Sequence, residues 1–147
     1  MQVKIQEITH GSIEYELEVK LRSKILREPL GLRFTDKELA KENDDIHLGA
    51  FVDEKLLGCL SLRFISNATI KMRQVAVDAN VQGLGIGRRL VGACEAKARA
   101  LGFSDIELNA RESAMPFYLN LGYEAFGEPF IEVTLPHRKM RKHLKQN

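Results

Sequence analysis

Apolar residues recur along the chain with two periods, and each period predicts one kind of element. Strict alternation of apolar and polar residues predicts a strand, whereas apolar residues three to four positions apart predict an amphipathic helix. Gly, Pro and capping residues mark the ends. In chain order the sequence predicts a strand at Val3–Ile8, a helix from Ile13 that Pro29 and Gly31 end, a short helix from Thr35 to about Asn43, strands at Ile46–Asp53, Leu56–Ile65 and Thr69–Asp78, a helix at Gly87–Leu101, a strand at Ser104–Ala110, a short helix from Glu112 that Gly122 ends, and a final hairpin of Tyr123–Gly127 and Phe130–Pro136. The order is β-α-α-β-β-β-α-β-α-β-β in one mixed sheet.

Two of the predicted helices carry apolar stripes that should face the sheet. The stripe of the first is Ile13, Leu17, Leu21 and Ile25, and the stripe of the helix that follows residue 86 is Leu90, Cys94, Ala98 and Leu101. Thr35–Glu38 reads TDKE, which has the form of a capping box and predicts the start of the second helix. The apolar stripes therefore predict a buried face for two of the helices, and the capping box predicts where the short second helix begins.

Composition indicates a single domain spanning residues 1–147. A chain of 147 residues with 44% hydrophobic and 29% charged residues can bury a sizeable core. It holds 22 Lys and Arg against 20 Asp and Glu, but five of the basic residues lie in the last eleven, HRKMRKHLKQN. The rest is therefore net acidic, which argues against a nucleic-acid-binding surface. We expect residues 136–147 to be a basic, solvated and frayed tail, and nucleic-acid binding through it is the weakest function considered.

The sequence shows no sign of export, a membrane span or a metal site. The opening MQVKIQEITHG lacks the apolar core of a signal peptide, and no apolar run is long enough to cross a bilayer, so we expect a cytoplasmic protein. Cys59 and Cys94 lie far apart and are expected to be buried, reduced thiols. His10, His47 and His143 show no ligand spacing, so no metal is expected.

A glycine-rich stretch, NVQGLGIGRRL at Asn80–Leu90, lies between a predicted strand and a predicted helix. It fits neither a dinucleotide fingerprint, whose third glycine place falls on Arg88, nor a P-loop, because two arginines follow Gly87. A loop whose backbone N–H groups surround a pyrophosphate at a helix N-terminus fits better, since alternate glycines clear the approach. Arg88 and Arg89 add charge that could reach a further phosphate. Taken alone, the loop could equally be a connecting turn.

A second motif follows about thirty residues downstream of the loop. QGLGIG at Gln82–Gly87 and FYLNLGYE at Phe117–Glu124 resemble motif A, Q/R-x-x-G-x-G/A, and the xYxxxGF segment of the GNAT superfamily of acyl-CoA N-acyltransferases. The resemblance covers Ile46–Pro136, while residues 1–45 agree only in element order. It implies an α/β (α+β) fold with a mixed, mostly antiparallel twisted sheet flanked by helices. It also implies acetyl-CoA as co-substrate and an amine as acceptor.

The resemblance further implies which residues hold the donor. In the family, a bulge in the strand before motif A offers backbone groups to the pantetheine amides, and the matching residues are Val75, Ala76 and Val77. The loop that would hold the pyrophosphate consists of Gln82, Gly83, Leu84, Gly85, Ile86, Gly87 and Arg88. The strands MRQVAV and IELNA would splay apart around the pantetheine arm, with Asn109 beside it. Tyr118 matches the tyrosine that gives a proton to the leaving sulfur, and Arg111 stands where many members carry Asn.

The implied reaction is direct attack of the amine on the thioester in a ternary complex. An amine such as that of lysine has a pKa near 10.4, so freeing it at pH 7 costs about 4–5 kcal/mol and calls for a base, a water chain or a dry pocket. The strand before motif A offers only Arg73 and Gln74 where many members have an acid, so the base stays open among Glu107, Glu132 and His137.

Two classes of function remain. The first is an N-acetyltransferase that acts on a small-molecule or protein amine, and the second is a non-catalytic acyl-CoA-binding or sensing module. The presence of Tyr118 favours the enzyme, while the missing acid before motif A leaves the module open. A homodimer is a further expectation, because many relatives pair through terminal strands. The sequence does not indicate the acceptor.

Overall fold

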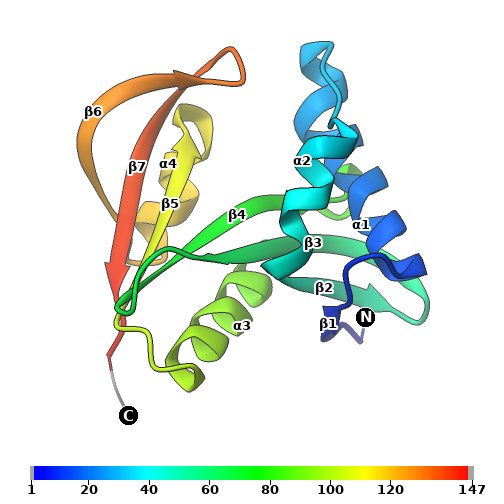
Figure 1. Ribbon diagram of the computed structural model, residues 1–147, viewed down its shortest axis with the longest axis horizontal. Helices are drawn as coiled ribbons and strands as arrows, with labels where there is room; N and C mark the ends of the chain where they lie inside the picture. Colours follow the sequence, from blue (N-terminus) through cyan, green and yellow to red (C-terminus); the bar gives the residue numbers. More distant parts are fainter. Residues whose placement is uncertain (1, 146–147) are drawn as a thin grey trace.

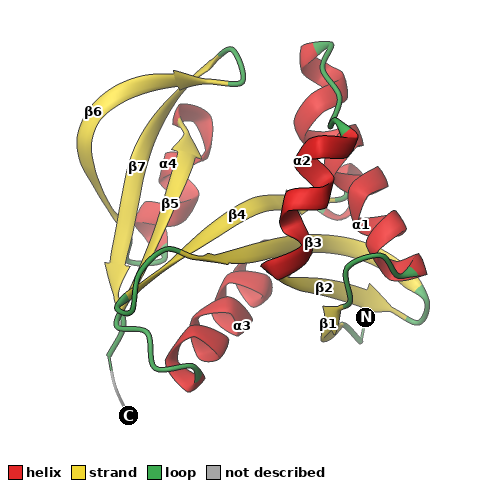
Figure 2. Cartoon of the chain, in the orientation of Figure 1, coloured by secondary structure: helices red, strands yellow, loops and turns green. Residues whose placement is uncertain are grey.

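The chain folds into a bent, seven-stranded sheet with helices on both faces (Figures 1 and 2). The computed structural model describes residues 2–145. Its helices and strands are β1 (Lys4–Ile8), α1 (Ile13–Arg22), α2 (Asp36–Ala40), β2 (Ile46–Val52), β3 (Lys55–Phe64), β4 (Thr69–Val77), α3 (Ile86–Ala100), β5 (Asp105–Arg111), α4 (Met115–Asn120), β6 (Glu124–Glu132) and β7 (Leu135–His143). Short π- and 3₁₀-helical segments join them at Ser23–Arg27 (η1), Glu28–Leu30 (η2), Lys41–Asp44 (η3), Ala79–Val81 (η4) and Glu112–Ala114 (η5). The predicted order of elements and the mixed sheet are confirmed.

The strands lie in the order β1-β2-β3-β4-β5-β7-β6, and neighbours pair antiparallel except at the centre. There β4 and β5 run parallel and pair only over Thr69–Lys71 and Asp105–Glu107. Beyond these residues the two strands separate, as the resemblance implies, and Figure 1 shows β5–β7 turned away from β1–β3. The sheet therefore has two halves joined by one short parallel contact.

A bulge bends β4 shortly after its last pair with β5, which is at Lys71. Between the pairs Cys59–Ala76 and Ser61–Arg73, β4 holds one residue more than β3, and Gln74 has a left-handed backbone with φ of 56°. A non-glycine residue in this conformation is strained by roughly 1–3 kcal/mol, and such strain gathers at functional sites. The predicted bulge before the glycine loop is confirmed.

Helix α3 covers one face of the sheet, and α1 covers the other (Figure 1). Leu90, Cys94 and Ala98 of the predicted α3 stripe are fully buried, whereas Leu101 at the helix end is 45% exposed. Cys59 and Cys94 are both free and fully buried, which confirms them as core residues, and this burial raises the pKa of both thiols. Within residues 2–145, no helix has the length and apolarity that a bilayer span requires.

The predicted apolar stripe of α1 is correct at one end and wrong at the other: Leu21 is buried and Ile25 packs against the core, but the first two positions face outward. Ile13 is 73% exposed and Leu17 is 37% exposed, while Glu18 and Arg22 are fully buried against the sheet. The helix turns its charged side inward because partners for both charges lie there. The predicted end of the helical segment is correct, since η1 and η2 continue it to Gly31, which has a φ of 71°.

The two buried charges of α1 belong to one network. Arg22 donates to Glu18 Oε2 at 2.9 Å and to Glu42 Oε2 at 2.6 Å, and His47 Nδ1 lies 2.9 Å from Glu18 Oε2. Burial opposes the charge of Arg22, yet its hydrogen bond with Glu42 raises its pKa. Ligand-type atoms of Glu18, Glu42 and His47 lie within 4.8 Å of one another, a closeness that the sequence spacing did not reveal. The guanidinium of Arg22 supplies positive charge there, and the expectation of no metal stays a prediction.

Most of the predicted tail is a strand and not frayed, and residues 146 and 147 of it lie outside the described residues. Leu135–His143 forms β7, which pairs with β5 along one edge and with β6 along the other. Met140 and Leu144 are fully buried. The two strands predicted as Tyr123–Gly127 and Phe130–Pro136 are one bulged strand, β6, and the turn falls at Val133–Thr134. The sequence pattern missed β7 because its polar positions outnumber its buried apolar ones.

This placement predicts the effect of a core substitution in β7. Met140→Ala should lower the free energy of unfolding by roughly 2–5 kcal/mol, because it removes a fully buried side chain. The matched change at its exposed neighbour, Lys139→Ala, should change it by less than about 1 kcal/mol. Urea denaturation followed by circular dichroism measures both changes in the free energy of unfolding. Equally small effects of the two substitutions would indicate that this segment is frayed.

Candidate active site

The glycine loop leads from β4 directly into the N-terminus of α3. Asp78 accepts a hydrogen bond from the backbone N–H of Asn80 at 2.9 Å, and Gln82 donates its side-chain amide to the carbonyl of Val77 at 3.0 Å. Gly83 and Gly85 have φ of 85° and 86°, which glycine adopts without strain. Gly85 is the N-cap of α3, and no side chain among residues 2–145 caps this helix end. Its first-turn N–H groups are therefore available to an anion, and the helix dipole favours one there.

A cleft of about 470 Å³ opens along this loop, and we term it the donor cleft. The residues predicted for the donor that line it are Val75, Ala76, Val77, Gln82, Gly83, Gly85, Ile86, Gly87, Arg88 and Tyr118. Leu84 is 62% exposed and does not line the cleft. Arg89 donates to the carbonyl of Val3 at 2.9 Å, so Arg88 is the arginine of the pair that faces the cleft. One continuous stretch of chain thus forms most of the donor cleft.

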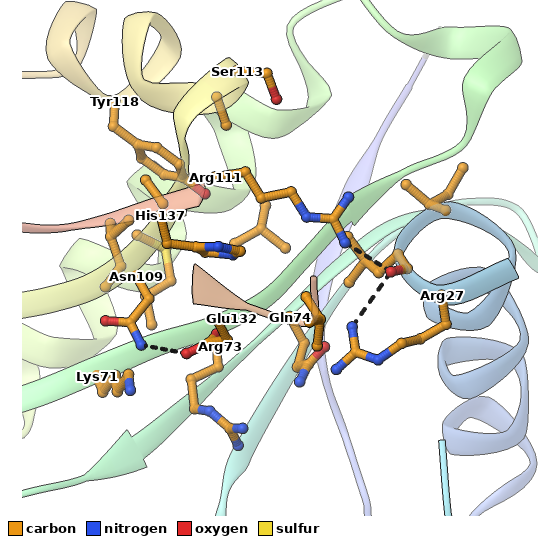
Figure 3. Close-up of a pocket in the computed structure, with 18 of the residues that line it drawn as sticks. Arg27, Lys71, Arg73, Gln74, Asn109, Arg111, Ser113, Tyr118, Glu132 and His137 are labelled. Atoms are coloured by element: carbon orange, nitrogen blue, oxygen red, sulfur yellow. Dashed lines mark hydrogen bonds between the residues drawn. The ribbon is translucent and has the colours of Figure 1, made fainter. Parts of the chain in front are cut away.

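A second cavity of about 690 Å³ adjoins the first, and we term it the acceptor cavity (Figure 3). It lies between η1, the separated strands β4 and β5, and the β6–β7 turn. Asn109 lines this cavity rather than the donor cleft, and its amide donates to Glu132 Oε2 at 3.0 Å. The two cavities share five lining residues, which are Ile25, Val75, Gln82, Ala114 and Tyr118.

Tyr118 lies on α4 at the boundary of the two cavities. Its side chain is almost buried, and its ring packs edge-on against Phe117 and Tyr123 at centroid distances of 5.0 and 5.8 Å. Burial raises the pKa of Tyr118, so the phenol is protonated at neutral pH. Its hydroxyl makes no hydrogen bond within residues 2–145, which leaves it free to donate to a ligand atom.

The structure separates the three candidate bases. Glu107 lines neither cavity and stands opposite Lys71 and Arg141 in the sheet. Glu132 lines the acceptor cavity but is exposed and accepts a hydrogen bond from Asn109. His137 lines the same cavity and is only 4% exposed, and its Nδ1 lies 2.8 Å from the carbonyl of Leu135. Because a carbonyl only accepts, this contact requires a proton on Nδ1, and in the tautomer that it selects the lone pair belongs to Nε2.

Several wall residues of the acceptor cavity were not foreseen as site residues. These are Arg27 of η1 and three residues of β4, which are Lys71, Arg73 and Gln74. Arg111, noted in the sequence only as a departure from the family, donates to the carbonyl of Leu26 at 2.7 Å and so ties β5 to η1. The wall comes from segments far apart in the chain, so no local motif marks it.

Comparisons with known proteins agree with this geometry. A family model described as an acetyltransferase (GNAT) domain matches residues 27–144. Uncharacterized protein YyaT of Bacillus subtilis is 24% identical over 101 residues, which cover 69% of this chain and 68% of YyaT. An uncharacterized acetyltransferase of Streptococcus pyogenes is 29% identical over 72 residues, which cover 48% of this chain and 49% of that protein.

Solved structures share the fold along almost the whole chain. An acyl-CoA N-acyltransferase from Pseudomonas aeruginosa has a TM-score of 0.80 at 21% identity, with 96% of this chain and 99% of that one covered. A GNAT family acetyltransferase from Elizabethkingia anophelis with acetyl-CoA bound has a TM-score of 0.75 at 17% identity, with 97% and 98% covered. The fold and the family model together define the class: this chain belongs to the GNAT acetyltransferase family.

The loop geometry predicts which glycines cannot change. Gly85→Leu and Gly87→Leu should abolish acetyl-CoA binding while the domain stays folded. A Cβ at Gly87 would lie 3.2 Å from Phe117 Cζ and 3.7 Å from Val77 Cγ2, so a longer side chain fills the donor cleft. Gly92→Leu is the matched control, because a Cβ at this exposed position of α3 meets nothing within 4 Å. Isothermal titration with acetyl-CoA measures binding, and normal binding by the Gly87 variant would show that the loop does not hold the donor.

Proposed function

We propose that this chain transfers an acetyl group from acetyl-CoA to the amine of an acceptor by direct attack in a ternary complex. The observation that carries the proposal is the meeting of the donor cleft and the acceptor cavity at Tyr118. A ternary mechanism needs two reactants to approach one point from different sides, and two adjoining cavities offer such an approach. Neither free cysteine lines a cavity, which agrees with the absence of an acyl-enzyme step.

The donor cleft offers contacts for each part of acetyl-CoA. The uncapped N-terminus of α3 and the Gln82–Arg88 loop would bind the pyrophosphate, and Arg88 adds a positive charge at the same place. Backbone groups of Val75, Ala76 and Val77, which β5 does not pair, would bind the pantetheine arm. The thioester would then lie near the bulge, between Val75 and Tyr118.

Two proton transfers accompany the step in which the new C–N bond forms and the C–S bond breaks. The attacking amine loses a proton, and we assign its removal to His137, which lines the acceptor cavity and whose Nδ1 is engaged by the carbonyl of Leu135, so that Nε2 is the nitrogen left to accept it. The departing sulfur gains a proton, and we assign its supply to the hydroxyl of Tyr118. His137 thus replaces the acid that the strand before the glycine loop lacks.

The alternative is an acyl-CoA-binding or sensing module without catalysis. Such a module needs the donor cleft alone, whereas this chain also has an acceptor cavity with Tyr118 and His137 in its wall. Nucleic-acid binding through a flexible tail loses its basis, because Leu135–His143 is a paired strand inside the sheet. A cytoplasmic location, a homodimer and chemistry without a metal stay predictions from the sequence.

Tyr118→Phe tests the acid. It should lower turnover by roughly 10²-fold or less and leave acetyl-CoA binding unchanged, because a thiol with a pKa near 8.5 is a fair leaving group even without protonation. Thiol release from acetyl-CoA, followed with an amine panel, measures turnover. Complete loss of activity with the donor still bound would contradict the simple acid role. Tight acetyl-CoA binding by the unaltered chain, with no thiol release for any amine, would support the module.

His137→Gln tests the base. It should lower kcat/KM for an amine that the unaltered chain acetylates by roughly 10²-fold at pH 7. The loss should shrink as the pH rises toward 9.5, because more of the amine is then already deprotonated. Glu132→Gln, in the same cavity wall, is the matched control and should retain most activity. An equal loss for His137→Gln at every pH would mean that the ring only shapes the cavity.

A further inference from the structure

The wall of the acceptor cavity is strongly basic. Four cationic side chains line it, which are Arg27, Lys71, Arg73 and Arg111, against a single carboxylate, that of Glu132 (Figure 3). This excess contrasts with residues 1–136 as a whole, which hold more acidic than basic residues. The charge of this wall is therefore opposite in sign to the net charge of residues 1–136.

The charge of Arg73 is poorly compensated. Its Nη1 lies 3.8 Å from Oδ2 of Asp45, but Arg63 already holds that carboxylate through two hydrogen bonds of 3.0 and 2.9 Å. Nη1 of Arg73 is also a buried nitrogen without a hydrogen-bond partner among residues 2–145. Burial and the nearby Arg63 lower the pKa of Arg73. The side chain as a whole is 25% exposed and lines the cavity, and Arg73 shares its one nearby carboxylate with Arg63, so the guanidinium retains charge for an anion in the cavity.

Unlike Arg73, which lies near Asp45, the other three cations make no ion pair with an acid within the described residues. Arg111 and Arg27 both donate to the carbonyl of Leu26, at 2.7 and 3.4 Å. A carbonyl carries no net charge, so these hydrogen bonds do not neutralise the charge of either guanidinium. Lys71 makes no ion pair there, and burial and the charge of Arg73 lower its pKa. Glu132 is exposed and hydrogen-bonded to Asn109. The cavity therefore retains several positive charges when it holds no acceptor.

Positive charges that gather in a partly buried cavity repel one another, and an anion that enters relieves the repulsion. Guanidinium groups pair with carboxylate and phosphate through two parallel hydrogen bonds, which suits the three arginines. The same charges disfavour a polycationic acceptor. Their place in the wall beside His137 and Tyr118 puts an anion in the cavity where the reacting amine must also lie.

We propose that the acceptor is a small amine that also carries a carboxylate or phosphate group, and that Arg73 and Lys71 bind this group. The inference rests on the proposed function only for the statement that the amine becomes acetylated. The anion-binding part stands on the cavity itself, so it can be tested with or without turnover.

The experiment compares acceptors that differ in one anionic group. The pairs are β-alanine with β-alaninamide, which tests a carboxylate, and ethanolamine phosphate with ethanolamine, which tests a phosphate. Thiol release gives kcat/KM for each, and titration in the presence of coenzyme A gives the dissociation constant. We expect at least one anionic member to exceed its neutral partner by roughly tenfold or more, the size expected for a hydrogen-bonded charge.

Variants then assign the effect to the cavity. Arg73→Gln and Lys71→Gln should each reduce the preference for the anionic member by roughly tenfold and leave the affinity for acetyl-CoA unchanged. Two positions are tested so that Lys71→Gln decides the matter if Arg73→Gln does not fold. Arg141→Gln is the control of equal charge change, since Arg141 is exposed on β7, pairs with Glu124 and does not line the cavity. It should leave the preference unchanged.

The outcomes separate this inference from the proposed function. Acetylation of the neutral members with equal or greater efficiency would overturn the anionic acceptor and leave the transferase intact. Binding of an anionic member that Arg73→Gln or Lys71→Gln weakens, without thiol release for any amine, would support the anion site and overturn the transferase. A loss of acetyl-CoA affinity in Arg73→Gln and Lys71→Gln would assign the cations to the donor and overturn the inference.

Discussion

The separation of β4 from β5 is the constraint on which the site depends. The two strands pair over Thr69–Lys71 and Asp105–Glu107 and then part, while β3 and β7 continue to pair along their outer edges. Backbone groups on the inner edges therefore have no strand partner, and a buried peptide group without a partner is costly. The strained residue Gln74 lies in the part of β4 that β5 no longer pairs. A ligand with amide groups of its own can pair with these edges, and both cavities open where the strands part.

The buried charges of α1 fix the opposite wall of the acceptor cavity. Arg22 joins Glu18 to Glu42, and the segment that follows it directly, η1, carries Ile25 and Arg27 into the cavity wall. Buried ion pairs contribute little net stability, because desolvation offsets their attraction, but they restrict how elements can pack. The bond from Arg111 to the carbonyl of Leu26 connects this wall to β5 across the gap. The residue that departs from the family pattern thus serves to hold the two halves of the site together.

The sequence predicts the elements well where local physics decides them. The capping box at Thr35 and Glu38, the end of the first helical segment at Gly31 and the buried α3 stripe all follow from local spacing. It fails where distant partners decide. From local spacing Glu18 and Arg22 are expected to face solvent. They are buried because Arg22 also bonds Glu42, which lies twenty positions further along the chain. The sequence of β7 resembles a basic tail because it has no regular alternation of apolar and polar residues. Its pairing with β5 and β6 nevertheless makes it a strand and buries Met140.

The two halves of the site differ in the same way. The donor cleft is built mainly from one continuous segment, Val75–Arg88, so a motif could identify it and its chemistry. The acceptor cavity draws Arg27, Arg73 and His137 from η1, β4 and β7, which only the folded sheet brings together. Net charge is equally uninformative, since the chain is nearly neutral and its cavity is basic. The shape and charge of this cavity are therefore a property of contacts between distant segments, which no local motif in the sequence records.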